Sequence, residues 1–257
     1  MLTVSPSSAT GAPLPSSAAP PAVGSVRNLN LALGFSTALV VGVLAWVMFV
    51  TPADTNLGIV QKIFYFHVGT AFGMLLCLVG ASACAAIDLM SPSEPIDAAG
   101  RALTEVGLVC ALAVLTSGPL WARKSWGTWW TWEPRLTLTL LVSLVALAVM
   151  ILRDIAGDSA QGRKIANSLA VLAAPMAYLI HIAVQKWGGT HPQVLQGGGI
   201  SSSDMRIAFW GSVAAVLAMC FSLAALRYRT LRSEGQIQLL RLELSARELR
   251  RNRKEAA

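Results

Sequence analysis

Six long stretches of the sequence contain no Asp, Glu, Lys or Arg. They cover residues 28–53, 63–87, 106–122, 136–152, 165–185 and 207–226. A helix needs about 20 apolar residues to cross the hydrocarbon core of a bilayer, with about 17 as the lower limit, so each stretch is long enough. Backbone polar groups in contact with lipid must be satisfied internally, which favours helices. The sequence therefore predicts an all-α integral membrane protein with six transmembrane helices.

The composition agrees with this fold class and separates a membrane domain from two different ends. Hydrophobic residues make up 54% of the chain, charged residues 13%, and the mean hydropathy is +0.59. Residues 1–26 are rich in Ser, Pro, Ala and Gly and have no charged side chain, so we expect a disordered cytoplasmic tail. Residues 27–226 form the six-span domain. Residues 227–257 are basic with helical spacing, and we expect a cytoplasmic helix solvated at the membrane surface, with a specific docking site as the alternative.

The distribution of Lys and Arg predicts the orientation. If the six stretches cross in turn, the termini and the even-numbered loops share one side and hold 14 of the 20 basic residues. The positive-inside rule then places both termini in the cytoplasm of a bacterial inner membrane. The basic tail decides this count, because without it the two sides hold five and six. The same tail accounts for much of the net charge of +7, and we expect no nucleic-acid partner.

The third loop contains an unusual concentration of tryptophan. Residues 126–137 read WGTWWTWEPRLT and hold four of the eight tryptophans of the chain. If this run is helical, Trp126, Trp129 and Trp130 share one face, Trp132 lies at its edge, and Pro134 ends the helix. The predicted result is an aromatic surface along the membrane interface. An ordinary belt of interfacial tryptophans is the alternative.

All three histidines of the chain belong to the same side as this loop. His67 is predicted one turn into span two, His181 about one turn before the end of span five, and His191 in the fifth loop. Indole rings suit a flat ligand, the guanidinium groups of Arg123 and Arg135 with nearby Lys124 suit carboxylates, and imidazole suits a metal. Haem combines these three features, whereas a quinone or a lipid headgroup does not require two imidazoles.

The remaining functional candidates have simpler explanations. His181 is explained by a polar side chain that reaches the membrane interface from near a helix end. The four cysteines lie inside spans and form neither a C-x-x-C nor a C-x-x-C-H motif. We expect them to pack as small apolar residues, so the chain is neither a thiol oxidoreductase nor itself a c-type cytochrome. Pro119 and Pro175 are predicted to kink their helices.

The tryptophan-rich loop resembles the WWD motif of haem-handling proteins of cytochrome c maturation, and its RLT ending resembles the CcmC family. The similarity extends to IFYFHV at the start of span two and to VQKWGGTHPQ after span five. The resemblance implies a periplasmic WWD loop that binds haem b non-covalently and transiently, together with Trp187, and axial iron ligands at His67 and His191. Glu133 stands where the family more often has aspartate. A Trp pair ahead of Trp187 is interrupted by Lys186.

The same resemblance implies a delivery protein without enzymatic activity. Its implied partners are the lipid bilayer, haem, the periplasmic haem chaperone CcmE, the ATP-driven transporter CcmA–CcmB and the small protein CcmD. Two alternatives remain. A b-type cytochrome or quinol oxidoreductase subunit also holds haem between histidines, and a haem lyase of the same superfamily carries a similar motif.

Overall fold

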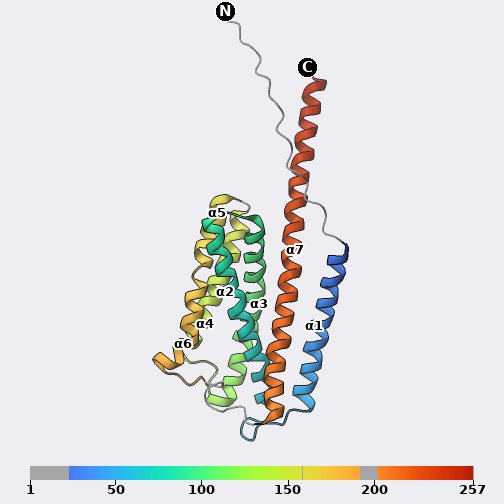
Figure 1. Cartoon of the computed structure of the whole chain (residues 1–257). Helices are drawn as coiled ribbons and strands as arrows, with labels where there is room; N and C mark the ends of the chain where they lie inside the picture. Colours follow the sequence, from blue (N-terminus) through green and yellow to red (C-terminus); the bar gives the residue numbers. More distant parts are fainter. Residues whose placement is uncertain (1–22, 158, 192–201, 257) are drawn as a thin grey trace, which may run out of the picture.

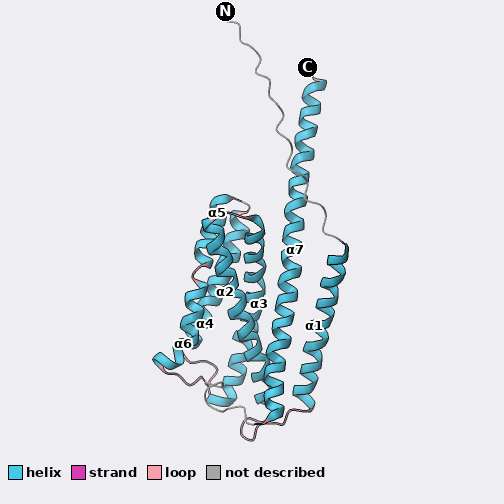
Figure 2. Ribbon diagram, in the orientation of Figure 1, coloured by secondary structure: helices cyan, strands magenta, loops and turns pink. Residues whose placement is uncertain are grey.

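The computed structural model describes residues 23–157, 159–191 and 202–256, and these are helical with short connections (Figures 1 and 2). The elements are α1 (Val23–Phe49), the 3-10 turn η1 (Ile59–Lys62), α2 (Ile63–Met90), α3 (Glu94–Trp126), α4 (Pro134–Ala156), α5 (Ala160–Ala170), α6 (Ala173–Trp187) and α7 (Ser203–Glu255). Six helical segments are long and apolar enough to cross a membrane, with α5 and α6 together forming one of them. The predicted all-α fold with six spans is confirmed.

The helices alternate in direction, so the connections gather at the two ends of the bundle. The α1–α2 and α3–α4 connections lie together at the lower end in Figure 1, where α6 ends and α7 begins. The α2–α3 and α4–α5 connections lie at the opposite end, from which α7 projects. The prediction that the three odd-numbered loops converge is confirmed for their described residues, and this brings distant parts of the sequence into one site.

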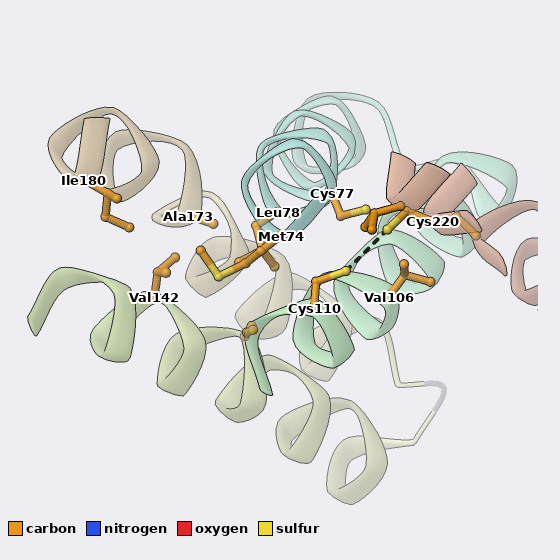
Figure 3. Close-up of a cluster of buried hydrophobic side chains, with 13 residues drawn as sticks. Met74, Cys77, Leu78, Val106, Cys110, Val142, Ala173, Ile180 and Cys220 are labelled. Carbon is orange, nitrogen blue, oxygen red and sulfur yellow. Dashed lines mark hydrogen bonds between the residues drawn. The ribbon is translucent and has the colours of Figure 1, made fainter. Parts of the chain in front are cut away.

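Small side chains from several helices pack in the centre of the bundle (Figure 3). Cys77 from α2, Cys110 from α3 and Cys220 from α7 are buried there, and the Sγ atoms of Cys110 and Cys220 are 3.3 Å apart. Without water between helices, van der Waals contact of small residues is a principal source of association in lipid. These three cysteines therefore serve the packing role predicted for them, while Cys84 is only half-buried.

Span five is interrupted near Pro175. Proline has no N–H, so the carbonyl of Val171, four residues earlier, lacks its usual helical donor. The Ser82 hydroxyl of α2 donates to this carbonyl at 2.8 Å, and α6 begins again at Ala173. The kink predicted at Pro175 takes the form of a break between α5 and α6.

The end of the bundle away from the tryptophans is held by buried charges. Arg153 pairs with Asp97, and Arg163 pairs with Asp88, whose side chain is 3% exposed. Asn167 donates to Asp88 at 2.8 Å and also accepts from Arg153. These five residues come from α2, α3, α4 and α5, so one network joins four helices.

The two predicted tails differ in how the structure describes them. Residues 1–22 of the N-terminal tail lie outside the described residues, and α1 begins at Val23. The basic tail is the continuation of span six, because α7 runs unbroken for 53 residues, about 80 Å. Arg227 pairs with Glu105 at 2.5 Å and Arg232 pairs with Glu94 at 3.5 Å, and beyond these contacts with α3 the C-terminal part of α7 projects past the other helices (Figure 1). The tail is thus a helix that continues the axis of its span, and its position at the membrane surface stays a prediction.

Candidate functional site

The tryptophan-rich segment is not helical, so the prediction of a continuous helical face was wrong. α3 ends at Trp126, and Gly127 follows with a φ of 74°, a left-handed conformation that glycine adopts without strain. Residues 127–133 are irregular. Pro134 begins α4, where its missing N–H leaves no hydrogen bond unmade. The indoles are therefore spread around a turn between two helices.

This turn covers a cavity of about 330 Å³, at the lower end of the range for small-molecule pockets. The cavity lies between α2, α3, α4, α6 and α7 at the end where the odd-numbered loops meet. Most of the lining is aliphatic or aromatic. The polar and large aromatic members used below are His67, Trp121, Trp126, Trp129, Trp130, Arg135, His181 and His191.

The other predicted site residues surround the cavity without lining it. Trp132 is 76% exposed, and its ring lies edge-on to Trp130 with centroids 5.9 Å apart. The guanidinium of Arg123 lies 5.9 Å from the centroid of Trp129 and donates to the carbonyl of Gly127. Trp187 is 55% exposed at the end of α6. Trp129 itself is 56% exposed, so the indole side of the site faces outward.

His67 is held by the neighbouring helix α3. Its Nδ1 lies 2.9 Å from the hydroxyl of Ser117, and this hydroxyl lies 2.5 Å from the carbonyl of Ala113. Gly118 makes room for the imidazole, because a Cβ atom there would lie 3.1 Å from Cε1 of His67. The ring is thus oriented by a hydrogen bond on one nitrogen and by a closely fitting backbone.

His191 is held by residues at the start of α4. Its Nδ1 lies 3.1 Å from Nη1 of Arg135, and its ring lies edge-on to Trp126 with centroids 6.3 Å apart. Arg135 also donates from Nε to the carbonyl of Ile180 at 3.2 Å. The carboxylate of Glu133 accepts from the backbone N–H of Thr190 at 2.6 Å. The contacts of Glu133 with Thr190 and of Arg135 with His191 therefore join the end of the tryptophan-rich turn to the segment that carries His191.

Several residues of this site were not predicted from the sequence. Ser117 and Gly118 position His67, and Trp121 lines the cavity, donates to Gln61 at 3.2 Å and lies edge-on to Trp126. The residues of α3 that line the cavity, between Val114 and Ala122, follow one face of this helix. Helical periodicity in the sequence would have indicated that face. His181, predicted to have only an interfacial role, also lines the cavity.

The lining has the donor set that an iron porphyrin requires. Three imidazoles and three indoles of the WWD segment line one cavity, together with the guanidinium of Arg135. Buried polar atoms in the same turn have no hydrogen-bond partner among the described residues. They include Nε1 of Trp130, Oγ1 of Thr131 and Oε1 of Glu133. Such atoms usually have a partner in a complete site, so the turn is equipped to contact a polar ligand.

Comparison with known proteins gives a consistent result. The sequence matches the family described as CcmC, heme exporter protein C, over residues 18–246. It is similar to proteins named heme exporter protein C from several bacteria. The protein from Haemophilus influenzae is 27% identical over 178 residues, covering 69% of this chain and 71% of the relative. The Escherichia coli K12 protein is 26% identical over 201 residues, covering 78% and 82%. The Bradyrhizobium diazoefficiens protein is 29% identical over 192 residues, covering 70% and 71%.

Proposed function

The chain belongs to the CcmC family, heme exporter protein C, and we propose that it binds haem at the periplasmic face of the bacterial inner membrane and presents it to a chaperone. It is a multi-pass membrane protein with a haem-handling role in cytochrome c maturation. The finer proposal is that haem b is held non-covalently and transiently, and that the receiving protein is a periplasmic chaperone resembling CcmE. The positive-inside rule supports a periplasmic position for the tryptophans.

One observation carries this proposal: His67 and His191 line the same cavity, beneath the tryptophan-rich turn. They come from α2 and from the segment after α6, more than 120 positions apart in the sequence. We assign these two imidazoles as axial ligands of the haem iron. Trp126, Trp129 and Trp130 would contact the porphyrin faces or edges, with Trp132 and Trp187 at the entrance.

We assign Arg123 and Arg135 to the haem propionates. A guanidinium pairs with a carboxylate through charge-assisted hydrogen bonds, and both residues lie beside the indoles. Arg135 belongs to the lining, whereas Arg123 lies outside it above Trp129. An exposed ion pair such as that of Arg123 contributes about 0–1 kcal/mol, so it orients a ligand without trapping it. Arg135 is half-buried in the lining, and its pair contributes more.

The exposure of the site supports delivery over storage. Aromatic stacking adds about 0.5–1.5 kcal/mol per pair beyond area burial, and more than half of the Trp129 side chain is exposed. A chaperone can therefore reach the same ligand surface. In this proposal the protein has no catalytic chemistry of its own. It works with the ATP-driven transporter CcmA–CcmB and the small protein CcmD.

The test is an absorption spectrum of the purified protein with and without added haem. Two imidazole ligands should give a six-coordinate, low-spin spectrum. His67→Ala and His191→Ala should each change the spectrum and reduce bound haem, whereas His181→Ala should do little. Loss of binding in His181→Ala with normal binding in His191→Ala would show that the second ligand is assigned wrongly.

The two alternative functions predict results that differ from those of haem delivery. A quinol-oxidising cytochrome would pass electrons from quinol through a permanently bound haem, and a haem lyase would leave haem covalently attached to an apocytochrome. Normal maturation of c-type cytochromes in cells that lack this protein would contradict the delivery proposal.

A further inference from the structure

The hydrogen bond of His67 determines which of its nitrogens carries the proton. The Ser117 hydroxyl lies 2.5 Å from the Ala113 carbonyl, and two oxygens this close require a proton between them. Ser117 has only that one proton, so toward His67 its oxygen accepts. Nδ1 of His67 is therefore the donor in the 2.9 Å contact. In the neutral ring this leaves the lone pair on Nε2, ready to bind a metal.

His191 has the opposite arrangement. Its Nδ1 lies 3.1 Å from Nη1 of Arg135, and a guanidinium can only donate hydrogen bonds. Nδ1 of His191 therefore accepts, and a neutral ring carries its proton on Nε2. These two of the three histidines that line the cavity are held in different tautomers, and of the two His67 presents an unprotonated Nε2.

His191 cannot become an iron ligand while this contact persists. If Nδ1 binds the metal, the lone pair that accepts from Arg135 is no longer available. If Nε2 binds, its proton is lost to water and another is taken up at Nδ1, where an N–H would face the N–H of Arg135. Either route requires His191 and Arg135 to separate.

Arg135 is held on the backbone of a helix. It donates from Nε to the carbonyl of Ile180 at 3.2 Å and from Nη2 to the carbonyl of His181 at 3.4 Å, both in the backbone of α6. His191 belongs to the irregular segment that follows α6. Separation therefore occurs by movement of His191, and it leaves Nη1 of Arg135 facing the cavity.

We propose that Arg135 is a latch that a carboxylate of the ligand opens. Without ligand, Arg135 holds His191 in a non-ligating tautomer, so that of these two histidines His67 is the one that can accept the iron. A haem propionate then replaces His191 at Nη1 of Arg135, because a carboxylate accepts a stronger, charge-assisted hydrogen bond than an imidazole does. His191 is released to bind the iron as the second axial ligand. Reversal of the exchange would remove this ligand first during hand-over.

This inference rests on the proposed haem function, and it assigns the two axial ligands unequal roles. The full-length protein in detergent should be titrated with ferric protoporphyrin IX and with its dimethyl ester, which has the same ring and iron but no carboxylate. We expect a low-spin spectrum with two imidazole ligands for the acid. The ester should give a high-spin spectrum with His67 as its one imidazole ligand.

Substitution of the latch should remove the difference between the two porphyrins. In Arg135→Met the ester should become low-spin, because His191 is no longer restrained, and the acid should bind about 10-fold more weakly after losing its charged partner. In His191→Ala both porphyrins should be high-spin. Glu248→Ala, on the exposed tail far from the cavity, should retain the wild-type difference. The comparison of the two porphyrins in the wild-type protein tests the proposal even if a variant fails to fold.

The possible outcomes distinguish failure of the latch from failure of the proposed haem binding. Low-spin spectra for both porphyrins in the wild-type protein would refute the latch while leaving haem binding intact. A high-spin ester spectrum that stays high-spin in a folded Arg135→Met variant would also refute it. No binding of either porphyrin would refute the proposed function and, with it, the latch.

Discussion

Glu133 joins the tryptophan-rich turn to the segment of His191, and its removal should weaken haem binding without unfolding the bundle. Oε2 of Glu133 accepts from the backbone N–H of Thr190 at 2.6 Å and from the Thr190 hydroxyl at 3.1 Å. His191 is the next residue, so these two bonds determine where its backbone lies. Neither bond belongs to the packed interior of the helices.

The expected magnitude follows from these two bonds. A shielded hydrogen bond to a charged group contributes about 1.5–3 kcal/mol, and exposure to water reduces this to about 1 kcal/mol each. Glu133→Ala removes both, about 2 kcal/mol, whereas Glu133→Gln keeps a neutral acceptor and loses about 1 kcal/mol. If this free energy holds the binding-competent arrangement, haem affinity should fall about 30-fold in the first variant and about 5-fold in the second.

The assay is a haem titration of the purified variants followed by absorbance, with circular dichroism to measure helix content. Thr190→Val removes only the hydroxyl bond and should have a smaller effect than Glu133→Ala. Glu248→Ala, on the exposed tail, removes a carboxylate far from the site and should bind like the wild type. Binding of haem to folded Glu133→Ala within twofold of wild type would refute this account of how His191 is positioned.

Four further predictions test other parts of the structure. Gly118→Ala would place a Cβ atom 3.1 Å from Cε1 of His67, so haem titration should show binding at least about 5-fold weaker, whereas Gly34→Ala, with open space around it, should be neutral. Cysteines introduced at Thr128 and at Gln236 should label from opposite sides with an impermeant thiol reagent, and labelling from one side would overturn the orientation. Asp88→Asn should lower the free energy of unfolding by about 2 kcal/mol in a denaturant titration, with haem affinity unchanged, because Arg163 loses its charge-assisted bonds to Asp88 and keeps only the pair with Asp97 at 3.6 Å. Trp129 and Trp130 replaced together by Ala should stop transfer of haem to the chaperone while membrane insertion persists, and transfer at the wild-type rate would exclude these indoles from the site.

The spans and the convergence of the histidines with the tryptophans were predictable because both follow from hydrophobic length and from parity. The backbone path of the tryptophan-rich turn was not predictable. This path depends on the left-handed conformation of Gly127, and helical spacing in the sequence does not reveal where the helix ends. Ser117 and Gly118 resemble ordinary helix-packing residues until α2 is placed beside α3. The contact between Arg135 and His191 joins residues 56 positions apart, and only the tertiary structure brings them together.

The two ends of the bundle are held together in different ways, and this difference suits a protein that releases its ligand. At the far end, pairs of Asp88 with Arg163 and of Asp97 with Arg153 are linked by a further pair of Arg163 with Asp97, and together they join four helices. At the site, the bonds from Thr190 to Glu133 are exposed to water, and the contact of His191 with Arg135 is only partly buried. Segments with few buried contacts open at low free-energy cost while the rest of a protein stays folded. Movement of His191 can therefore accompany the arrival and departure of haem without loosening the helices that hold His67.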